Sequence, residues 1–509
     1  MSLQRIQLIG FAPDLAQDTP GVIVASNRII PTTRGFTSGA QAATTNKSVS
    51  TGSNTGVYIA HTQAGTAYYY LGTATKLQVI NSLGTSVTDK SGSTYNSTLT
   101  GDGGWSFCAY GDKTIASNKF DTIQVADTGT GTFADISGAP KASIVQTVGP
   151  STAPFLMAFN YNDGTDTPNG VFWSALGDYT DWTPDTATQC GNVPLLEPSG
   201  PITAAKRFRD GVVVFKEDAM FLGTYIGTPN IWQFQCVARG VGCTAKNMVT
   251  EAGDALYFAD KRGAWKYDGS YPQLLPGAVH DFWARQLHPP SLSSVGYSQV
   301  VWDPFSHNLW ICGSRVGYLV WNAISGLWTY HDRIANSSTD SIAPFVQQLF
   351  GFIQQSVGVI KGVAAYNDGS TGYYVDICTF GDSYKTNEAT VSLTMGQFGD
   401  PIRFTQISRV APVWLSPWPA VIGSYTPITG GYTPDSHASC VVDVDSSLPA
   451  AAQTATGNGD QKTQSATIDA TSRYFDVTAN GNYLTVTLKD WNKAEFRDVV
   501  IDIAPSGTG

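Results

Sequence analysis

Two aspartates in a tryptophan-rich stretch are the side chains that come nearest to a catalytic pair. Asp178 and Asp181 lie on either side of Tyr179 in the segment Val171–Trp182. Glycoside hydrolysis needs only two carboxyl groups at the right separation, assembled across a fold, so sequence spacing does not exclude such a site. Aspartate is also a common residue in turns between strands. Only five of the 40 acidic residues are glutamate, which favours the turn interpretation and leaves the glycosidase as the alternative.

The local motifs of common enzyme classes are missing from the sequence. It contains no Gly-x-Ser-x-Gly elbow, no Walker A loop, no Gly-x-Gly-x-x-Gly after a strand and no His-Glu-x-x-His. The segment Asn162–Asp166 has the start of a calcium loop but lacks the later bidentate acid, so a turn is favoured. The six histidines form no i,i+4 pair. We therefore predict no catalytic residues, no metal site and no cofactor.

Composition points to an all-β protein. Charged residues make up 14% of the chain against a usual quarter, and Gly occurs 52 times. The preference for Asp over Glu suits turns better than helices. The seven cysteines are scattered without a Cys-x-x-Cys pair and are expected in the core as small apolar residues. A net charge of −10 without a basic run argues against a protein whose main task is to grip nucleic acid.

Short apolar runs separated by turns predict a series of hairpins. Val212–Phe215 and Ala219–Tyr225 flank one turn, and Ala255–Ala259 and Ala264–Tyr267 flank another, whose Gly263 suits a positive φ. Apolar onsets at Gly170, Val212, Ala255 and Ser298 are 42 or 43 residues apart, the length of a four-stranded propeller blade. We predict a β-propeller of about six blades within residues 1–400, closed by pairing an N-terminal strand with a late one. An ordinary β-sandwich is the alternative.

Two segments have a helical pattern. Val279–Leu287 follows Pro276-Gly277 and reads as a short helix, and Phe345–Val357 places apolar residues and glutamines on opposite sides of a second one. Beyond residue 400 the chain is rich in Pro, Ser and Thr before strands return. The predicted division is an N-terminal strand and polar loop (1–56), a propeller (57–399) and a C-terminal β-rich domain (400–509).

Neither a leader nor a membrane span is predicted. The first sixteen residues carry too short an apolar run for a signal peptide, and no stretch approaches 18 apolar residues. We expect synthesis in the cytoplasm and a soluble product.

The segment from Phe11 to Phe36 resembles the opening of the tail nozzle, or tail tubular, proteins of short-tailed bacteriophages. In that family an Asp-rich segment leads to Pro-Gly, then an Asn, a Pro and a Gly-aromatic pair. The matching positions are Asp14, Asp18, Pro20-Gly21, Asn27, Pro31 and Gly35-Phe36. Tyr110–Asn118, Val171–Trp182, Arg239–Cys243 and the hairpins of 302–328 also look like family elements. The resemblance lies in order and spacing, without a catalytic signature.

The resemblance implies a propeller-type virion protein. It implies a homo-oligomeric ring, a hexamer, below the portal and adaptor, with the genome passing through transiently without specific DNA binding. Receptor-binding tail fibres or spikes would attach to it, and it would contact the host cell surface. Its location would be the virion tail. The alternative from another class is a glycan-binding propeller or a virion-associated glycosidase, which should retain a glycan unaided.

Two expectations concern surfaces of that assembly. Trp414 and Trp418 lie in a Pro-Trp stretch of a chain with 13 Trp and few charges, and we predict a subunit or partner contact there, with packing inside the C-terminal domain as the alternative. A basic lumen would bind DNA through counterion release, whereas transit requires sliding. We therefore predict a ring lumen lined mainly by Asp, Asn, Gln, Ser and Thr.

Overall fold

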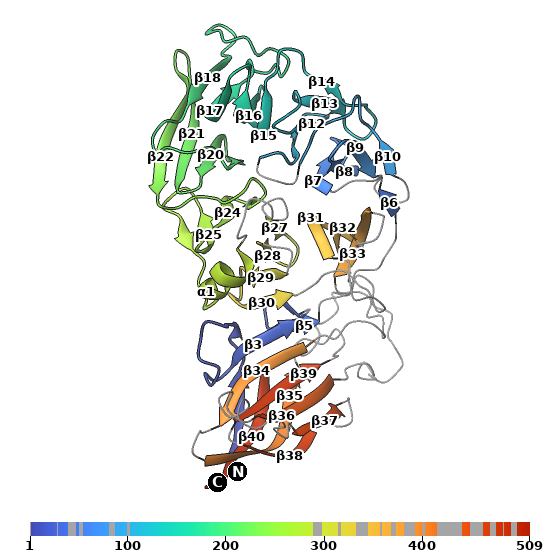
Figure 1. Cartoon of the computed structure of the whole chain (residues 1–509), viewed down its shortest axis with the longest axis vertical. Helices are drawn as coiled ribbons and strands as arrows, with labels where there is room; N and C mark the ends of the chain where they lie inside the picture. Colours follow the sequence, from blue (N-terminus) through green and yellow to red (C-terminus); the bar gives the residue numbers. More distant parts are fainter. Residues whose placement is uncertain are drawn as a thin grey trace, which may run out of the picture.

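The computed structural model is nearly all β, as predicted, and consists of a ring of sheets with a second pair of sheets beneath it (Figure 1). It describes residues 2–27, 29–38, 47–49, 54–80, 87–98, 102–288, 298–313, 317–331, 345–356, 359–367, 373–380, 392–399, 403–414, 440–447, 462–468, 475–481, 483–489 and 496–508. Within these ranges no helix is long and apolar enough to cross a membrane.

The ring contains seven four-stranded antiparallel sheets among the described residues, which we number blades 1 to 7 in chain order. The strands of blades 1 to 3 are β7 (Asn54–His61), β8 (Ala67–Thr73), β9 (Leu77–Ile80), β10 (Val87–Asp89), β11 (Ser106–Tyr110), β12 (Lys113–Ser117), β13 (Gln124–Asp127), β14 (Ala134–Asp135), β15 (Lys141–Val148), β16 (Phe155–Asn162), β17 (Asp166–Trp173) and β18 (Gly191–Pro194).

Blades 4 to 7 continue the same up-and-down order. Their strands are β19 (Ala204–Phe208), β20 (Gly211–Lys216), β21 (Ala219–Gly227), β22 (Ile231–Arg239), β23 (Val249–Ala252), β24 (Ala255–Asp260), β25 (Gly263–Tyr267), β26 (Gln273–Leu274), β27 (Gln299–Asp303), β28 (Asn308–Cys312), β29 (Tyr318–Asn322), β30 (Trp328–His331), β31 (Phe345–Ser356), β32 (Val359–Asn367), β33 (Tyr373–Phe380) and β6 (Lys47–Val49).

The first strands of the blades form the inner wall of the propeller. In cyclic order β7, β11, β15, β19, β23, β27 and β31 each contact the next, and β31 contacts β7, so the ring is closed. Alternate residues of a middle strand face opposite neighbours. In β20, Val213 and Phe215 join one buried cluster, while Val212 and Val214 join another. Burial on both faces explains why these strands are continuous apolar runs rather than alternating ones.

An N-terminal strand closes blade 7, which confirms the predicted mode of closure. β6 (Lys47–Val49) pairs antiparallel with β33, Ser48 opposite Tyr374. The blade count is seven rather than about six. The predicted helix at Phe345–Val357 is wrong, because this segment is strand β31 of blade 7, and reading it as a helix removed one blade.

The equal spacing of the predicted onsets does not mark equivalent strands. Gly170 lies in the third strand of blade 3, Val212 and Ala255 in the second strands of blades 4 and 5, and Ser298 just before the first strand of blade 6. The steps between these four onsets are nearly equal because differences in the lengths of the intervening linkers and turns cancel. The sheet topology confirms the propeller, whereas the steps of 42 or 43 residues do not mark one repeated blade unit.

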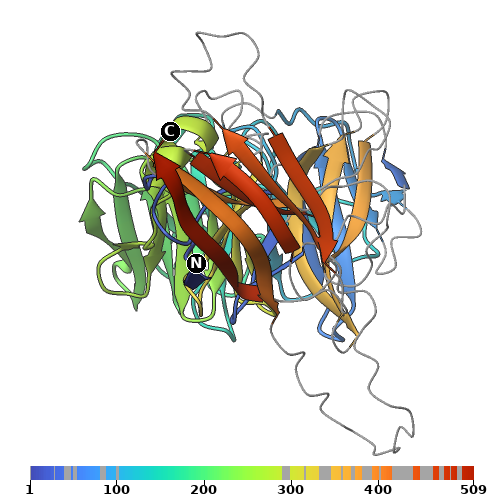
Figure 2. The ribbon, with the colours of Figure 1, turned by 90° about the horizontal axis from the view of Figure 1, so that it is seen from below.

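The second part of the molecule, which we call the terminal domain, is built from both ends of the chain. Two six-stranded sheets combine β1 (Ser2–Gln7), β2 (Gly10–Phe11), β3 (Val22–Asn27), β4 (Ile29–Pro31) and β5 (Phe36–Ser38) with β34 (Ser392–Gly399), β35 (Arg403–Trp414), β36 (Cys440–Ser447), β37 (Lys462–Ile468), β38 (Phe475–Gly481), β39 (Tyr483–Lys489) and β40 (Phe496–Thr508). In Figure 2, which is seen from below, these strands cross in front of the propeller. The strands within residues 2–38 and the strand at 392–399 therefore belong to the terminal domain. The predicted domain divisions, after residues 56 and 399, lie at other positions.

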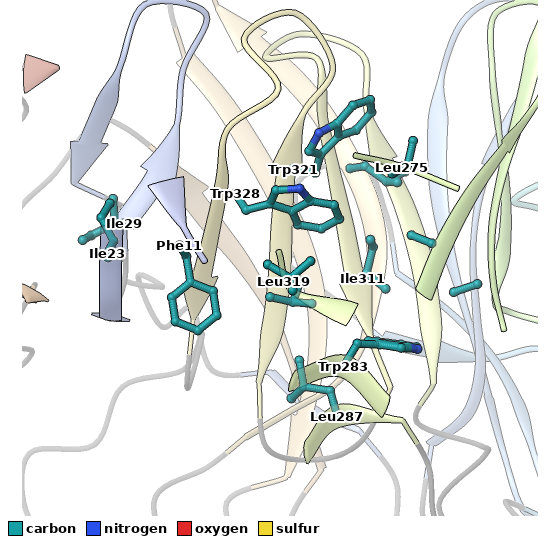
Figure 3. Close-up of a cluster of buried hydrophobic side chains, with 14 of the residues drawn as sticks. Phe11, Ile23, Ile29, Leu275, Trp283, Leu287, Ile311, Leu319, Trp321 and Trp328 are labelled. Atoms are coloured by element: carbon teal, nitrogen blue, oxygen red, sulfur yellow. The ribbon is translucent and has the colours of Figure 1, made fainter. Parts of the chain in front are cut away.

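The terminal domain is joined to the propeller through blade 6. β2, β3 and β4 contact β30, the outer strand of that blade. Figure 3 shows Phe11 between Ile23 and Ile29 of the terminal domain and Leu319 and Trp328 of blade 6, and all five belong to one buried cluster. The predicted short helix is present nearby as α1 (His280–Phe282), continued by a π-helical turn over Trp283–Leu287. One buried cluster therefore runs from the terminal domain through this helical turn into the propeller.

Candidate functional site

The two aspartates of the tryptophan-rich stretch are each engaged in a local turn. Asp178 Oδ1 accepts hydrogen bonds from Thr180 N at 2.8 Å and from Thr180 Oγ1 at 2.6 Å. Asp181 Oδ1 accepts one from Thr183 N at 3.0 Å. The bonds from Thr180 lower the pKa of the Asp178 carboxyl, which is opposite to the raised value that a general acid needs. Each aspartate closes its own turn, which is the interpretation that the sequence favoured.

The segment Asn162–Asp166 spans the turn between β16 and β17. Asn162 Oδ1 accepts from Gly164 N at 2.9 Å, and Asp166 forms an ion pair with Lys119 at 2.7 Å. These oxygens are engaged in closing the turn and in pairing with a lysine. Across the described residues, no group of three or more His, Cys, Asp or Glu side chains is placed to hold a metal ion.

The described cysteines lie mainly in the core. Cys108, Cys190, Cys243 and Cys312 are buried, and Cys236 is half-buried. Burial raises the pKa of Cys108 to about 12, so this thiol is not a ready nucleophile.

One mouth of the central channel is bridged by a lysine that sequence reasoning did not single out. Lys246 lies in the linker before β23 of blade 5. Its Nζ donates to the carbonyl oxygens of Asp102 at 2.9 Å, of Ser143 at 3.1 Å and of Gly104. Asp102 and Gly104 precede blade 2, which is as far from blade 5 as a seven-membered ring allows. The side chain therefore spans the mouth at which the inner strands begin.

The loop held by Lys246 also contacts blades 1 and 3, and it is linked to blade 4 through Asn160. Asn160 of blade 3 donates from Nδ2 to Asp102 Oδ2 at 2.8 Å and to the Ile202 carbonyl, before blade 4, at 3.3 Å. Trp105 N donates to Thr55 O of blade 1 at 2.9 Å. Burial lowers the pKa of Lys246 to about 7, and the negative charge of Asp102 opposes this shift. This polar network, which we call the mouth network, ties blades 1 to 5 together.

Below the mouth network the channel wall carries opposite charges. Lys206 of β19 and Glu251 of β23 come from neighbouring inner strands. Burial lowers the pKa of Lys206, and the Glu251 carboxylate acts against this shift. The channel wall thus carries one lysine and one glutamate on neighbouring strands, and Lys246 crosses the mouth above them.

A concavity of about 610 Å³ opens on the opposite face of the propeller, between blades 3 and 4. Its walls are the β15–β16 turn, the β19–β20 turn and the far half of β21. The lining residues are Pro150, Ser151, Thr152, Phe208, Arg209, Asp210, Gly211, Leu222, Thr224 and Tyr225. Volumes of this size are common for small-molecule sites.

Of the two tryptophans predicted at an interface, only the backbone of Trp414 lies within the described residues. Trp414 is the last residue of β35, and its backbone pairs with Phe496 of β40. Its side chain and the whole of Trp418 lie outside the described residues. The predicted contact stays a prediction.

Comparison with known proteins gives distant structural likeness alone. No family model and no curated protein matches the sequence. One similar solved structure is that of the computationally designed Ika8 protein, with 13% identity, a TM-score of 0.36, and coverage of 65% of this chain and 98% of that one. Another is YCF48 bound to D1 peptide, with 11% identity, a TM-score of 0.37, and coverage of 67% and 98%. The assignment as a β-propeller therefore rests on the sheet topology of the chain itself.

Proposed function

We propose that this chain is a structural subunit of a short phage tail, forming a nozzle ring below the portal and adaptor to which fibres attach. The observation that carries the proposal is where the residues of the family resemblance lie. Within the stretch 11–36, Asp14 lies at the joint between the propeller and the terminal domain, whereas Gly21, Gly35 and Phe36 pack inside the terminal domain, so the likeness concerns how the subunit is built.

The packing of the terminal domain depends on those residue types. An added Cβ at Gly35 would lie 2.4 Å from the Phe496 carbonyl oxygen, and Phe36 is fully buried against the Phe496 ring at 6.1 Å. At Gly21, with φ +81°, an added Cβ would lie 2.1 Å from the Gln7 carbonyl oxygen. Only glycine permits both close approaches.

The same segment reaches across to the propeller. Asp14 accepts hydrogen bonds from the backbone N–H groups of Asp281 and Phe282, at 2.8 and 2.9 Å, at the start of α1. Phe11 packs edge-on to Phe282 at 5.1 Å and stacks on Tyr330 at 5.8 Å. A rigid two-part subunit of this kind suits a load-carrying ring, and a fixed angle between the parts would set the ring's diameter.

The N-terminal segment also offers a surface for neighbours. Leu3, Ile9 and Leu15 are 64, 47 and 38% exposed. In this proposal these side chains contact a neighbouring copy or the adaptor. Because Lys246 bridges the propeller mouth, the genome in this proposal passes through the lumen between copies and not along a propeller axis.

The test is assembly with portal and adaptor proteins of a short-tailed phage from the same source as this chain, followed by mass photometry. We expect a complex with six copies for the intact chain and for Ile324→Ser, which changes a propeller residue that is 60% exposed. We expect loss of the complex for the triple variant Leu3→Ser, Ile9→Ser, Leu15→Ser. A chain that stays monomeric with its adaptor would contradict the proposal, and one that in addition hydrolyses a glycan would support the enzyme alternative.

A further inference from the structure

The concavity between blades 3 and 4 has the features of a ligand site, and its floor is held rigidly. Arg209 has φ +55°, a left-handed conformation that is uncommon for a residue other than Gly. Its carbonyl accepts a hydrogen bond from Arg207 Nε at 3.1 Å, its guanidinium donates to Asp268 O at 2.9 Å and also lies over the Phe208 ring at 4.8 Å. Such backbone strain persists only where the surroundings enforce it, and it gathers at functional sites.

The wall opposite this turn is aromatic and equally fixed. The Tyr225 hydroxyl donates to Gln189 Oε1 at 2.7 Å, while its ring packs against Phe155 at 5.4 Å and Trp232 at 5.6 Å. Trp232 is 5% exposed, yet its indole N–H has no hydrogen-bond partner within the described part of the chain. A half-buried tyrosine on a rigid aromatic base presents an apolar surface at little cost in side-chain entropy.

The polar groups around the concavity match a neutral ligand. Arg209 and Asp210 are consecutive, exposed and opposite in charge, so the turn carries no net charge. Ser151, Thr152 and Thr224 add three exposed hydroxyls on the other walls. An anion would meet the Asp210 carboxylate, and a cation would meet the Arg209 guanidinium. A ring with several hydroxyls can use both charged groups, because each hydroxyl donates and accepts.

We propose that this concavity binds a neutral saccharide of two to four rings, with Asp210 and Arg209 bonding its hydroxyls and Tyr225 contacting a ring face. The open shape suits an extended sugar chain that enters from one side. The site contains no pair of free acids positioned for hydrolysis among its lining residues, so its role is binding. This inference is independent of the proposed tail function, because it concerns one chain alone.

The test uses the full chain without adaptor. An immobilised panel of neutral oligosaccharides of two to four rings, together with sialylated and sulfated ones, is screened first. Titration calorimetry with each retained sugar then gives its Kd. We expect retention of at least one neutral member. The variants Asp210→Ala and Thr224→Val should each raise its Kd about tenfold, the loss of one good hydrogen bond.

The matched control is Asp254→Ala. Asp254 is an exposed aspartate in the β23–β24 turn, the equivalent turn of blade 5, outside the concavity. It should leave the Kd unchanged. Retention of charged sugars alone, of no member at millimolar concentration, or with a Kd that neither site variant alters would overturn the proposal. Thermal melting of each variant confirms that the fold is kept, and a failure of ring assembly would not change any of these readings.

Discussion

Lys246 Nζ donates a hydrogen bond of 2.9 Å to the carbonyl oxygen of Asp102, a residue 144 positions earlier in the chain. This contact joins two linkers on opposite sides of the ring. It holds the loop that Asn160 and Ser143 also bind. The propeller is therefore braced across its mouth as well as closed around its circumference.

The brace predicts a pH dependence of stability. Because burial lowers the pKa of Lys246 to about 7 from 10.5, the unfolded chain holds this proton more tightly than the folded chain. Stability from this group should rise as the pH increases from 7 towards 10, by at most about 1.4 kcal/mol per pH unit. Urea unfolding at pH 7, 8.5 and 10 should show this rise in the native chain and its loss in Lys246→Met. Lys141→Met, at an exposed lysine, serves as the control. Equal slopes for native chain and Lys246→Met would contradict the account.

Ring closure by β6 predicts an alternating response to proline. Successive N–H groups of a strand point to opposite edges, so only one of Ser48 and Val49 can donate towards β33. Proline at the residue whose N–H points to β33 should lower the free energy of unfolding by about 1–3 kcal/mol, because a carbonyl of β33 loses its donor. Proline at the residue whose N–H points away from β33 should lower it less. Thermal melting of Ser48→Pro and Val49→Pro, each beside its alanine variant, measures this difference. Two proline variants as stable as their alanine counterparts would show that β6 does not close the blade.

The joint predicts coupled unfolding of the two parts. Phe11 is 3% exposed and packs between Phe282 and Tyr330. Phe11→Ala should therefore lower the free energy of unfolding by about 3–5 kcal/mol. Calorimetry should then resolve two transitions in place of one. Phe305→Ala, at a residue 40% exposed in a blade 6 turn, should keep a single transition. A single unshifted transition for Phe11→Ala would mean that the joint carries no coupling.

The turn role of Asp178 gives a prediction that separates it from a catalytic acid. Its pKa is lowered from 3.8, so its contribution to stability is present at neutral pH and lost as the pH falls below that value. Asp178→Ala should cost about 0.5–1 kcal/mol at pH 7, because the turn is exposed and its hydrogen bonds are screened. Thr180→Val should cost a similar amount, and near pH 2 both differences should shrink. A glycan-hydrolysing activity that Asp178→Asn removes without a change in stability would support the enzyme alternative.

Local patterns predicted the hairpins of blades 4 and 5, because each is specified by neighbouring residues and a turn such as Asp260–Gly263. They failed at Phe345–Ser356 for a definite reason. Register shifts between Val346 and Gln348 and between Leu349 and Gly351 interrupt the strand's alternation, so its polar residues fall at helical spacing. Contacts between distant segments, such as β6 with β33 and Lys246 with Asp102, leave no local pattern. The 610 Å³ concavity combines three separate turns and strands and was missed for the same reason.

The central claim, a ring-forming tail subunit, is tested most directly by cryo-electron microscopy of this chain assembled with its portal and adaptor. The account predicts six copies in one ring, each with its terminal domain docked on blade 6, and a lumen between copies lined mainly by Asp, Asn, Gln, Ser and Thr. A map without this chain on the adaptor, or with a predominantly basic lumen, would contradict it.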